Sequence, residues 1–104
     1  MKILFDQGTP APLRFALSNH SVATAFEKGW SNLSNGDLLR EAEREFDLLI
    51  TTDKNLEYQQ NLVGRKIAIL VLPTTSWPKI QALQNKIATV VGNIKAGDYV
   101  ALDL

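Results

Sequence analysis

Apolar residues occur along the chain in two alternating patterns, short unbroken runs and stripes with helical spacing. Unbroken runs at 3–5, 47–53 and 67–72 are typical of strands that are covered on both faces of a parallel sheet. Stripes in which apolar residues recur every three or four positions are typical of amphipathic helices, and the clearest one lies over 76–96. The alternation of strand and helix predicts an α/β fold.

The pattern as a whole predicts five strands and four helices with short connections. The strands are expected at 3–5, 21–25, 47–53, 67–72 and 99–104. The helices are expected after Thr9-Pro10, after Ser34, from Asp53 through position 60, and over 76–96 with Gly97 as the stop. The expected architecture is a three-layer sandwich around a mostly parallel five-stranded sheet, in a single domain over 1–104.

Composition places the chain among ordinary globular proteins and excludes thiol chemistry. Of its 104 residues, 45% are hydrophobic and 21% are charged, which argues against disorder. The absence of cysteine excludes disulfides and thiolate metal sites and fits a reducing cytoplasm. Eleven basic and eleven acidic residues cancel, so RNA binding would need a local basic patch or bound metal ions. Because no run of some 18 apolar residues occurs, we expect a cytoplasmic protein without a membrane partner.

Three aspartates are predicted to meet at the carboxyl end of the sheet. Asp6 follows the first strand and Asp53 ends the third, and ligands of parallel sheets gather beyond these ends because loops and helix N-termini meet there. Asp37 lies in the first turn of the helix after the second strand and points the same way. With strands about 4.8 Å apart, Asp6 and Asp53 would lie roughly 5 or 10 Å apart at the backbone, depending on strand order.

A divalent cation would stabilise such a group of acids. Crowded carboxylates repel one another unless a cation neutralises them. Oxygen ligands select hard ions such as Mg²⁺ or Mn²⁺, and Mg²⁺ usually also contacts substrate phosphate. The three acids therefore predict a Mg²⁺ or Mn²⁺ site suited to phosphodiester hydrolysis.

The segments that contain these aspartates resemble the PIN-like nuclease family. In family order, ILFD, LSNGDLLREA and LLITTDKNL are similar to its strand-acid, helix-acid and TxD elements. The chain most resembles the shortened members that are suspected toxins in bacterial toxin–antitoxin pairs. The resemblance implies a PIN-like fold and a metal-dependent endoribonuclease, with RNA as substrate and a small antitoxin protein as partner. It also implies that Asp6, Asp37 and Asp53 are metal ligands and catalytic residues, and that Thr51 or Thr52 supports Asp53 through its hydroxyl.

The chain departs from the family pattern at two acidic positions. Full-length members usually carry a glutamate on an additional helix between the first two matched acids, and here Glu27 is the one nearby substitute. Many members place an acid two positions after the TxD aspartate, where this chain has Asn55, a neutral and weaker ligand. These departures keep open a non-catalytic PIN-like module that binds RNA or protein.

Several of these residues also have local structural explanations. Asp37 can complete a helix cap with Ser34, and Asp53 can cap its own helix, each contributing about 1 kcal/mol. Asp6 ends a buried strand without a helix to cap, which favours a functional role. Arg14 and Lys54 are the candidate RNA contacts near the carboxyl end, although scattered basic residues usually form a solvated surface.

Two further hypotheses follow from the sequence. A receiver-type phosphoacceptor domain also places acids after its first and third strands, but this chain has one acid rather than an adjacent pair at the first strand and no lysine after the fifth. The apolar stripe over 76–96 is expected to be a core element, and surplus apolar residues on it could also support a homodimer.

Overall fold

A single five-stranded sheet forms the centre of the computed structural model, which describes residues 1–56 and 64–104. Every neighbouring pair of strands is parallel, and the order across the sheet is β2-β1-β3-β4-β5. The strands are β1 (Lys2–Phe5), β2 (Ser21–Thr24), β3 (Leu48–Thr51), β4 (Ala68–Val71) and β5 (Tyr99–Ala101). The α/β fold with five strands is thereby confirmed, and the sheet is entirely rather than mostly parallel.

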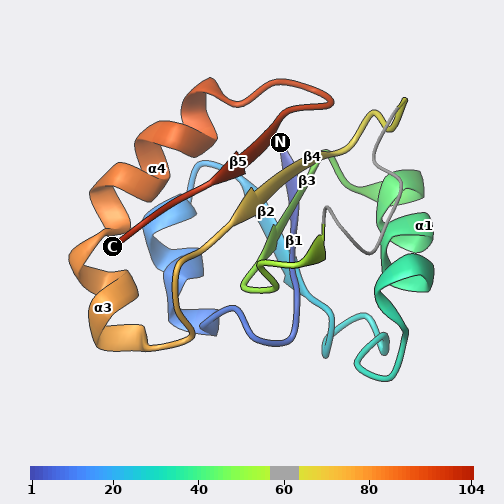
Figure 1. Ribbon diagram of the computed structural model, residues 1–104, viewed down its shortest axis with the longest axis horizontal. Coiled ribbons are helices and arrows are strands. Elements are labelled where there is room, and N and C mark those ends of the chain that lie inside the picture. The colour runs from blue at the N-terminus through green and yellow to red at the C-terminus, as the bar shows by residue number, and fades with distance from the viewer. Residues whose placement is uncertain (57–63) are drawn as a thin grey trace.

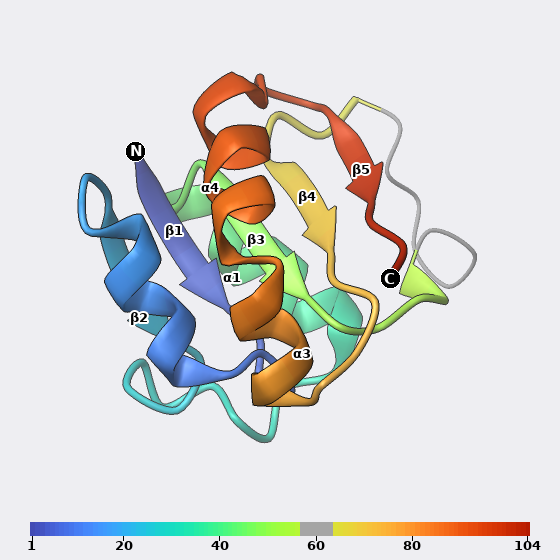
Figure 2. The ribbon, with the colours of Figure 1, turned by 90° about the vertical axis from the view of Figure 1, so that its left-hand side faces the viewer.

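Helices cover both faces of this sheet (Figure 1). One face is covered by the 3₁₀ helix η1 (Ala11–Leu17) together with α3 (Trp77–Ala82) and α4 (Gln84–Asn93). The other face is covered by α1 (Asn35–Glu45). Figure 2 looks onto the first face, with α3 and α4 in front of the strands and α1 behind them. The arrangement has the three layers that the alternation of strands and helices predicts.

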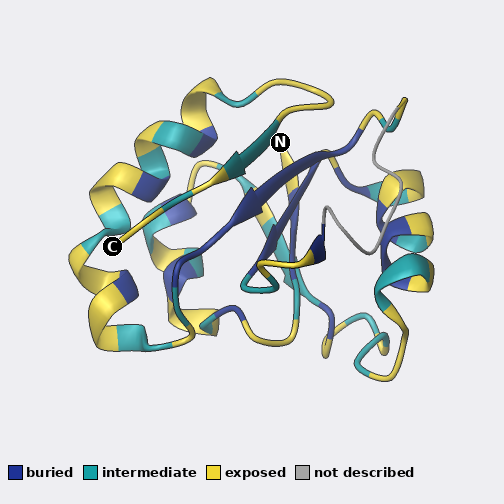
Figure 3. Ribbon diagram, viewed as in Figure 1, coloured by how far each residue is buried: buried dark blue, intermediate teal, exposed yellow. Residues whose placement is uncertain are grey.

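Each face of the sheet has its own hydrophobic core, because successive strand residues point to opposite faces. Ile3 and Phe5 face η1, α3 and α4, whereas Leu4 faces α1. The residues of β3 and β4 are all buried, as Figure 3 shows by colour. The continuous apolar runs in the sequence follow from this, since both faces of the central strands are covered.

The apolar stripe over 76–96 forms two helices rather than the one that was predicted. The break lies at Leu83, whose backbone has φ −101° and ψ 4°. Its N–H donates to Ile80 O, three residues back, which makes a tighter turn than an α-helix. Ile80 and Ile87 are fully buried on either side of the break. The stripe therefore predicted the buried face of this segment but not its interruption.

Two other predicted helices have different outcomes. The helix expected after Thr9-Pro10 is present as η1, and the Thr9 hydroxyl donates to Ile50 O rather than capping it. The helix expected from Asp53 through position 60 runs into residues 57–63, which lie outside the described residues.

Strand order places a topological switch point between β1 and β3. From β1 the chain first adds β2 on one side of the sheet, then crosses to the other side and adds β3, β4 and β5. In doubly wound sheets of this kind, ligands bind in the crevice at the carboxyl ends of the two strands where the winding reverses. Asp6 follows β1 and Asp53 follows β3, so both aspartates lie at this point.

Candidate functional site

Asp6 and Thr51 are connected directly at the carboxyl ends of β1 and β3. These strands are neighbours and Phe5 lies opposite Ile50, so Asp6 continues the register beside Thr51, two residues before Asp53. The Asp6 N–H donates to Ile50 O at 2.9 Å, which continues the ladder between the strands by one residue. The Thr51 hydroxyl donates to Asp6 Oδ2 at 2.8 Å, while Asp6 Oδ1 accepts the Gln7 N–H at 2.7 Å. Both oxygens of Asp6 are therefore held in place.

The same Thr51 hydroxyl also orders the chain around Asp53. It accepts the Asp53 N–H at 3.1 Å, and the Thr51 side chain is buried with 1% exposure. One buried hydroxyl thus joins Asp6 to the backbone of Asp53. Thr51 is one of the two threonines to which the resemblance assigns a supporting role.

The carboxylate of Asp53 has partners on two elements. Its Oδ1 accepts the backbone N–H of Asn55 at 2.9 Å, which is a local Asx turn. Its Oδ2 accepts from the side-chain amide of Asn35, the first residue of α1, at 2.7 Å. Asn35 therefore ties the N-terminus of α1 to the loop after β3. Sequence reasoning did not single out Asn35, and its place directly after the Ser34 cap was the available signal.

Asp37 lies one turn into α1 and has different partners. The Ser34 hydroxyl accepts the Asp37 N–H at 3.3 Å, so the predicted N-cap is present. The Asp37 carboxylate pairs with Arg40 at 3.0 Å and is about half exposed. On α1, the amide of Asn35 donates to Asp53, whereas the carboxylate of Asp37 accepts from Arg40.

Glu27 and Arg14 form an ion pair with two hydrogen bonds. Arg14 Nη2 donates to Glu27 Oε1 at 2.9 Å, and Nη1 donates to Oε2 at 3.2 Å. The hydrogen bonds from Arg14, together with the bond from the Thr24 N–H, lower the pKa of Glu27 to about 2. The same pairing raises the pKa of Arg14. Glu27, the substitute acid, and Arg14, a candidate RNA contact, are thus paired with each other.

Thr52 and Lys54 complete the set of predicted site residues. A Cβ atom at Gly8 would collide with Thr52 Oγ1, so the loops after β1 and β3 approach closely where glycine leaves room. Lys54 is exposed, and among the described residues it has no ion-pair partner. It is therefore an exposed basic side chain next to Asp53 in sequence.

The switch point offers the carboxylates of Asp6 and Asp53 as ligands for the expected Mg²⁺ or Mn²⁺. Within residues 1–56 and 64–104, no three acidic or histidine side chains are grouped as metal ligands would be. Asp6 and Asp53 supply two half-buried carboxylates, and each oxygen keeps lone-pair capacity beyond the one hydrogen bond described. Magnesium is commonly held by one or two carboxylates together with waters and substrate phosphate. The chemistry of these two acids is compatible with such an ion, although no third acid joins them among the described residues.

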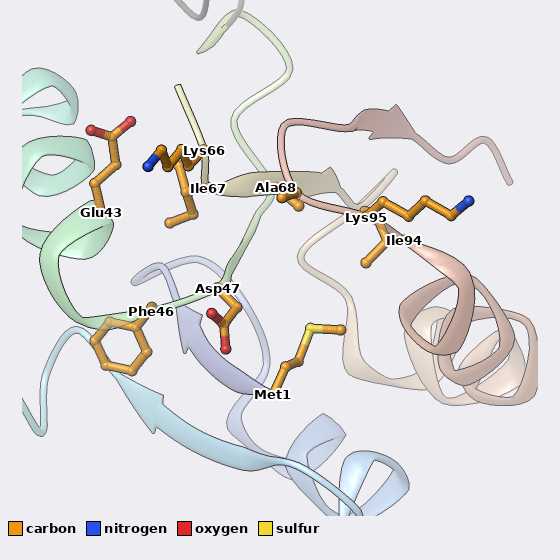
Figure 4. Close-up of a pocket in the computed structure, with 10 residues that line it drawn as sticks. Met1, Glu43, Phe46, Asp47, Lys66, Ile67, Ala68, Ile94 and Lys95 are labelled. Atoms are coloured by element: carbon orange, nitrogen blue, oxygen red, sulfur yellow. The ribbon is translucent and has the colours of Figure 1, made fainter. Parts of the chain in front are cut away.

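A cavity of about 500 Å³ lies at the opposite, amino end of the sheet (Figure 4). Met1, Asp47 and Ala68 line it, and none of the predicted site residues does. The Asp47 carboxylate accepts the Lys2 N–H at 2.8 Å, which accounts for it structurally. In Figure 4 the amino groups of Lys66 and Lys95 point in different directions and do not converge on the hollow. The cavity therefore adds nothing to the candidate site.

Comparisons of the chain with models of known families, with curated proteins and with solved structures found no match. Among the helices that the structure describes, none is long and apolar enough to cross a membrane.

Proposed function

We propose that this chain is a Mg²⁺- or Mn²⁺-dependent endoribonuclease with a PIN-like domain, acting in the cytoplasm as the toxin of a toxin–antitoxin pair. The observation that supports the proposal best is the hydrogen-bonded series Asp6–Thr51–Asp53 at the switch point between β1 and β3. Two of the three sequence segments that resemble the family, ILFD and LLITTDKNL, contain these residues. A small antitoxin protein that covers this end of the sheet would regulate the activity.

In this proposal Asp6 and Asp53 hold the ion and surrounding residues fix their orientation. The Thr51 hydroxyl fixes the orientation of the Asp6 carboxylate through a hydrogen bond to Oδ2. The Asn35 amide and the Asn55 N–H each bond one oxygen of the Asp53 carboxylate. Such supporting hydrogen bonds matter because ligands must be held close to their productive geometry. A bound divalent ion would polarise the scissile phosphate and make a coordinated water more acidic. Lys54 would contact a neighbouring phosphate of the RNA.

Asp37 has a secondary role in this arrangement. Its pairing with Arg40 leaves it about half exposed in the first turn of α1. There it would reach substrate or a second ion only by leaving Arg40, and an exposed pair of this kind contributes at most about 1 kcal/mol. Asp6 and Asp53 are accordingly expected to be the more sensitive positions.

The decisive experiment measures cleavage of a fluorescent single-stranded RNA that contains all four bases, with Mn²⁺, Mg²⁺ or EDTA. Metal-dependent cleavage should be lost in Asp6→Asn, because the substitution removes one charge from the ion's ligands. Asp98→Asn is the matched control: it makes the same change at the amino end of β5, where the carboxylate caps Lys95 N–H. Undiminished cleavage by Asp6→Asn would contradict the assignment.

A non-catalytic PIN-like module that binds RNA or protein is the second candidate. It is favoured by the amide of Asn35 at the position beside Asp53 and by the pairing of Glu27 with Arg14. Calorimetric titration with Mn²⁺ separates the two. The nuclease requires binding that Asp6→Asn and Asp53→Asn both weaken, whereas RNA binding without any Mn²⁺ binding would favour the module.

A further inference from the structure

Gly8 lies where three loops meet at the carboxyl end of the sheet. A Cβ atom placed on it would collide with Thr52 Oγ1 in the loop after β3, and it would lie 3.6 Å from Thr75 Cγ2 in the loop after β4. Because Gly8 does not have a positive φ, its backbone conformation is not one that excludes alanine. Glycine is therefore needed here for space rather than for backbone conformation.

The turn that contains Gly8 is anchored to β3 at both ends. Before it, the Asp6 N–H donates to Ile50 O at 2.9 Å. After it, the Thr9 hydroxyl donates to the same carbonyl oxygen at 2.9 Å, and Thr9 is buried. The Thr9 N–H also donates to Asp6 O at 3.0 Å, which closes the turn. A turn held in this way has little freedom to move away from Thr52.

Thr52, on the other side of this contact, directly precedes the proposed ligand Asp53. Threonine is branched at Cβ, so its hydroxyl turns only together with its methyl group. The buried Thr51 hydroxyl accepts the Asp53 N–H at 3.1 Å. A displacement of Thr52 would therefore distort this bond and move the carboxylate of Asp53. The Asp6 carboxylate would stay with Thr51, whose hydroxyl donates to it at 2.8 Å.

We propose that Gly8 is a positioning residue for the metal site, because the space that it leaves for Thr52 sets how closely the loop after β3 approaches the loop after β1. This role rests on the proposed function, in which Asp6 and Asp53 hold a divalent ion. A side chain at position 8 displaces residue 52 and changes the separation of the two carboxylates. It thereby weakens metal binding without contacting the ion, as the loss of a residue that orients a ligand does.

The test is a double-mutant cycle measured by calorimetric titration with Mn²⁺. In the wild-type background, Gly8→Ala should raise the dissociation constant of Mn²⁺ by about tenfold or more. In the Thr52→Ala background, the same substitution should change it by less than about twofold, because the two positions then no longer interact. The nearest atom of residue 52 to the new Cβ is then its own Cβ at 3.7 Å, which is an ordinary van der Waals contact. Wild-type affinity in Gly8→Ala, or an equal loss in both backgrounds, would overturn the proposal.

Gly92→Ala is the matched control. Gly92 is exposed on α4, and a Cβ atom placed there meets nothing within 4 Å. The substitution should leave the dissociation constant of Mn²⁺ unchanged, and a loss as large as that of Gly8→Ala would overturn the proposal. If Gly8→Ala does not fold, Gly8→Ala/Thr52→Ala should fold, since the collision is then absent. Failure of both variants to fold would also overturn the proposal.

Hydrogen exchange of the Asp53 amide, measured without metal, separates a failure of this proposal from a failure of the proposed function. In Gly8→Ala this amide should exchange faster than in the wild type, because its bond to Thr51 Oγ1 is distorted. In the Thr52→Ala background, Gly8→Ala should leave its exchange unchanged. Wild-type protein that binds no Mn²⁺ would contradict the metal site, and the exchange would still decide whether Gly8 positions Asp53. Equal exchange in Gly8→Ala and the wild type would overturn that role.

Discussion

Thr51 shows how much of the candidate site depends on one side chain. Its hydroxyl donates to Asp6 Oδ2 and accepts the Asp53 N–H. Thr51 is the last residue of β3, and its side chain is buried. A buried hydroxyl is used fully only when both its donor and its acceptor capacity are satisfied, as they are here. The geometry of two loops that carry carboxylates is therefore set from a strand, which is more rigid than the loops themselves.

Substituting Thr51 by valine should reduce both stability and activity. Valine has the same shape but removes the two hydrogen bonds to half-buried Asp6 Oδ2 and the Asp53 N–H, and one such bond contributes about 0.5–1.5 kcal/mol. We expect a loss of that order in the free energy of unfolding, measured in urea, together with weaker Mn²⁺ binding. Thr89→Val is the matched control, since the Thr89 hydroxyl bonds to Asn85 O on the exposed side of α4. Equal losses for the two variants would contradict the role given to Thr51.

Among the elements, η1 and the turn after β2 are joined by charge rather than by a continuous core. Residues 13 positions apart in sequence meet in the Arg14–Glu27 pair, while Leu13 and Leu17 anchor η1 to the sheet. The two elements thus approach through one packed face and one ion pair. Of these two contacts only the ion pair titrates, so the pH dependence of the free energy of unfolding separates its contribution from that of the apolar packing.

The contribution of Glu27 to stability should disappear in acid. The pKa of Glu27 is about 2 in the folded chain, against 4.5 for an unperturbed glutamate. The folded state therefore gains from the ionised carboxylate above pH 4.5 and loses that gain as the pH falls toward about 2. The difference in urea midpoint between the wild type and Glu27→Gln should be largest at neutral pH and should shrink over this interval. A difference that stays constant from neutral pH to pH 2 would contradict the pairing.

For the whole molecule, the sequence predicted what local composition determines and missed what distant contacts determine. The buried strands were predictable because β3 and β4 are continuously apolar, and the start of α1 was predictable from the Ser34 cap. The break at Leu83 was not, because the apolar spacing continues across it. The bond between Asn35 and Asp53 joins residues 18 positions apart, and no spacing rule specifies it. The position of Asp6 near the end of β3 was predicted in part. Ligands of parallel sheets gather at the carboxyl ends of the strands, but this rule does not specify the hydrogen bond between Thr51 and Asp6.

The proposed ion should stabilise the folded chain as a whole, because its two ligands come from loops that are brought together only by folding. A ligand that binds the folded state alone adds about 1.4 kcal/mol at ten times its dissociation constant. For a domain of this size that corresponds to a rise in Tm of roughly 6–11 °C. Wild-type protein heated with Mn²⁺ should show this rise, and Asp53→Asn should lose most of it, while Asp98→Asn should keep it. If Asp53→Asn kept the full rise, the ion would bind elsewhere, and the switch point between β1 and β3 would lose its assignment as a metal site even if RNA cleavage were observed.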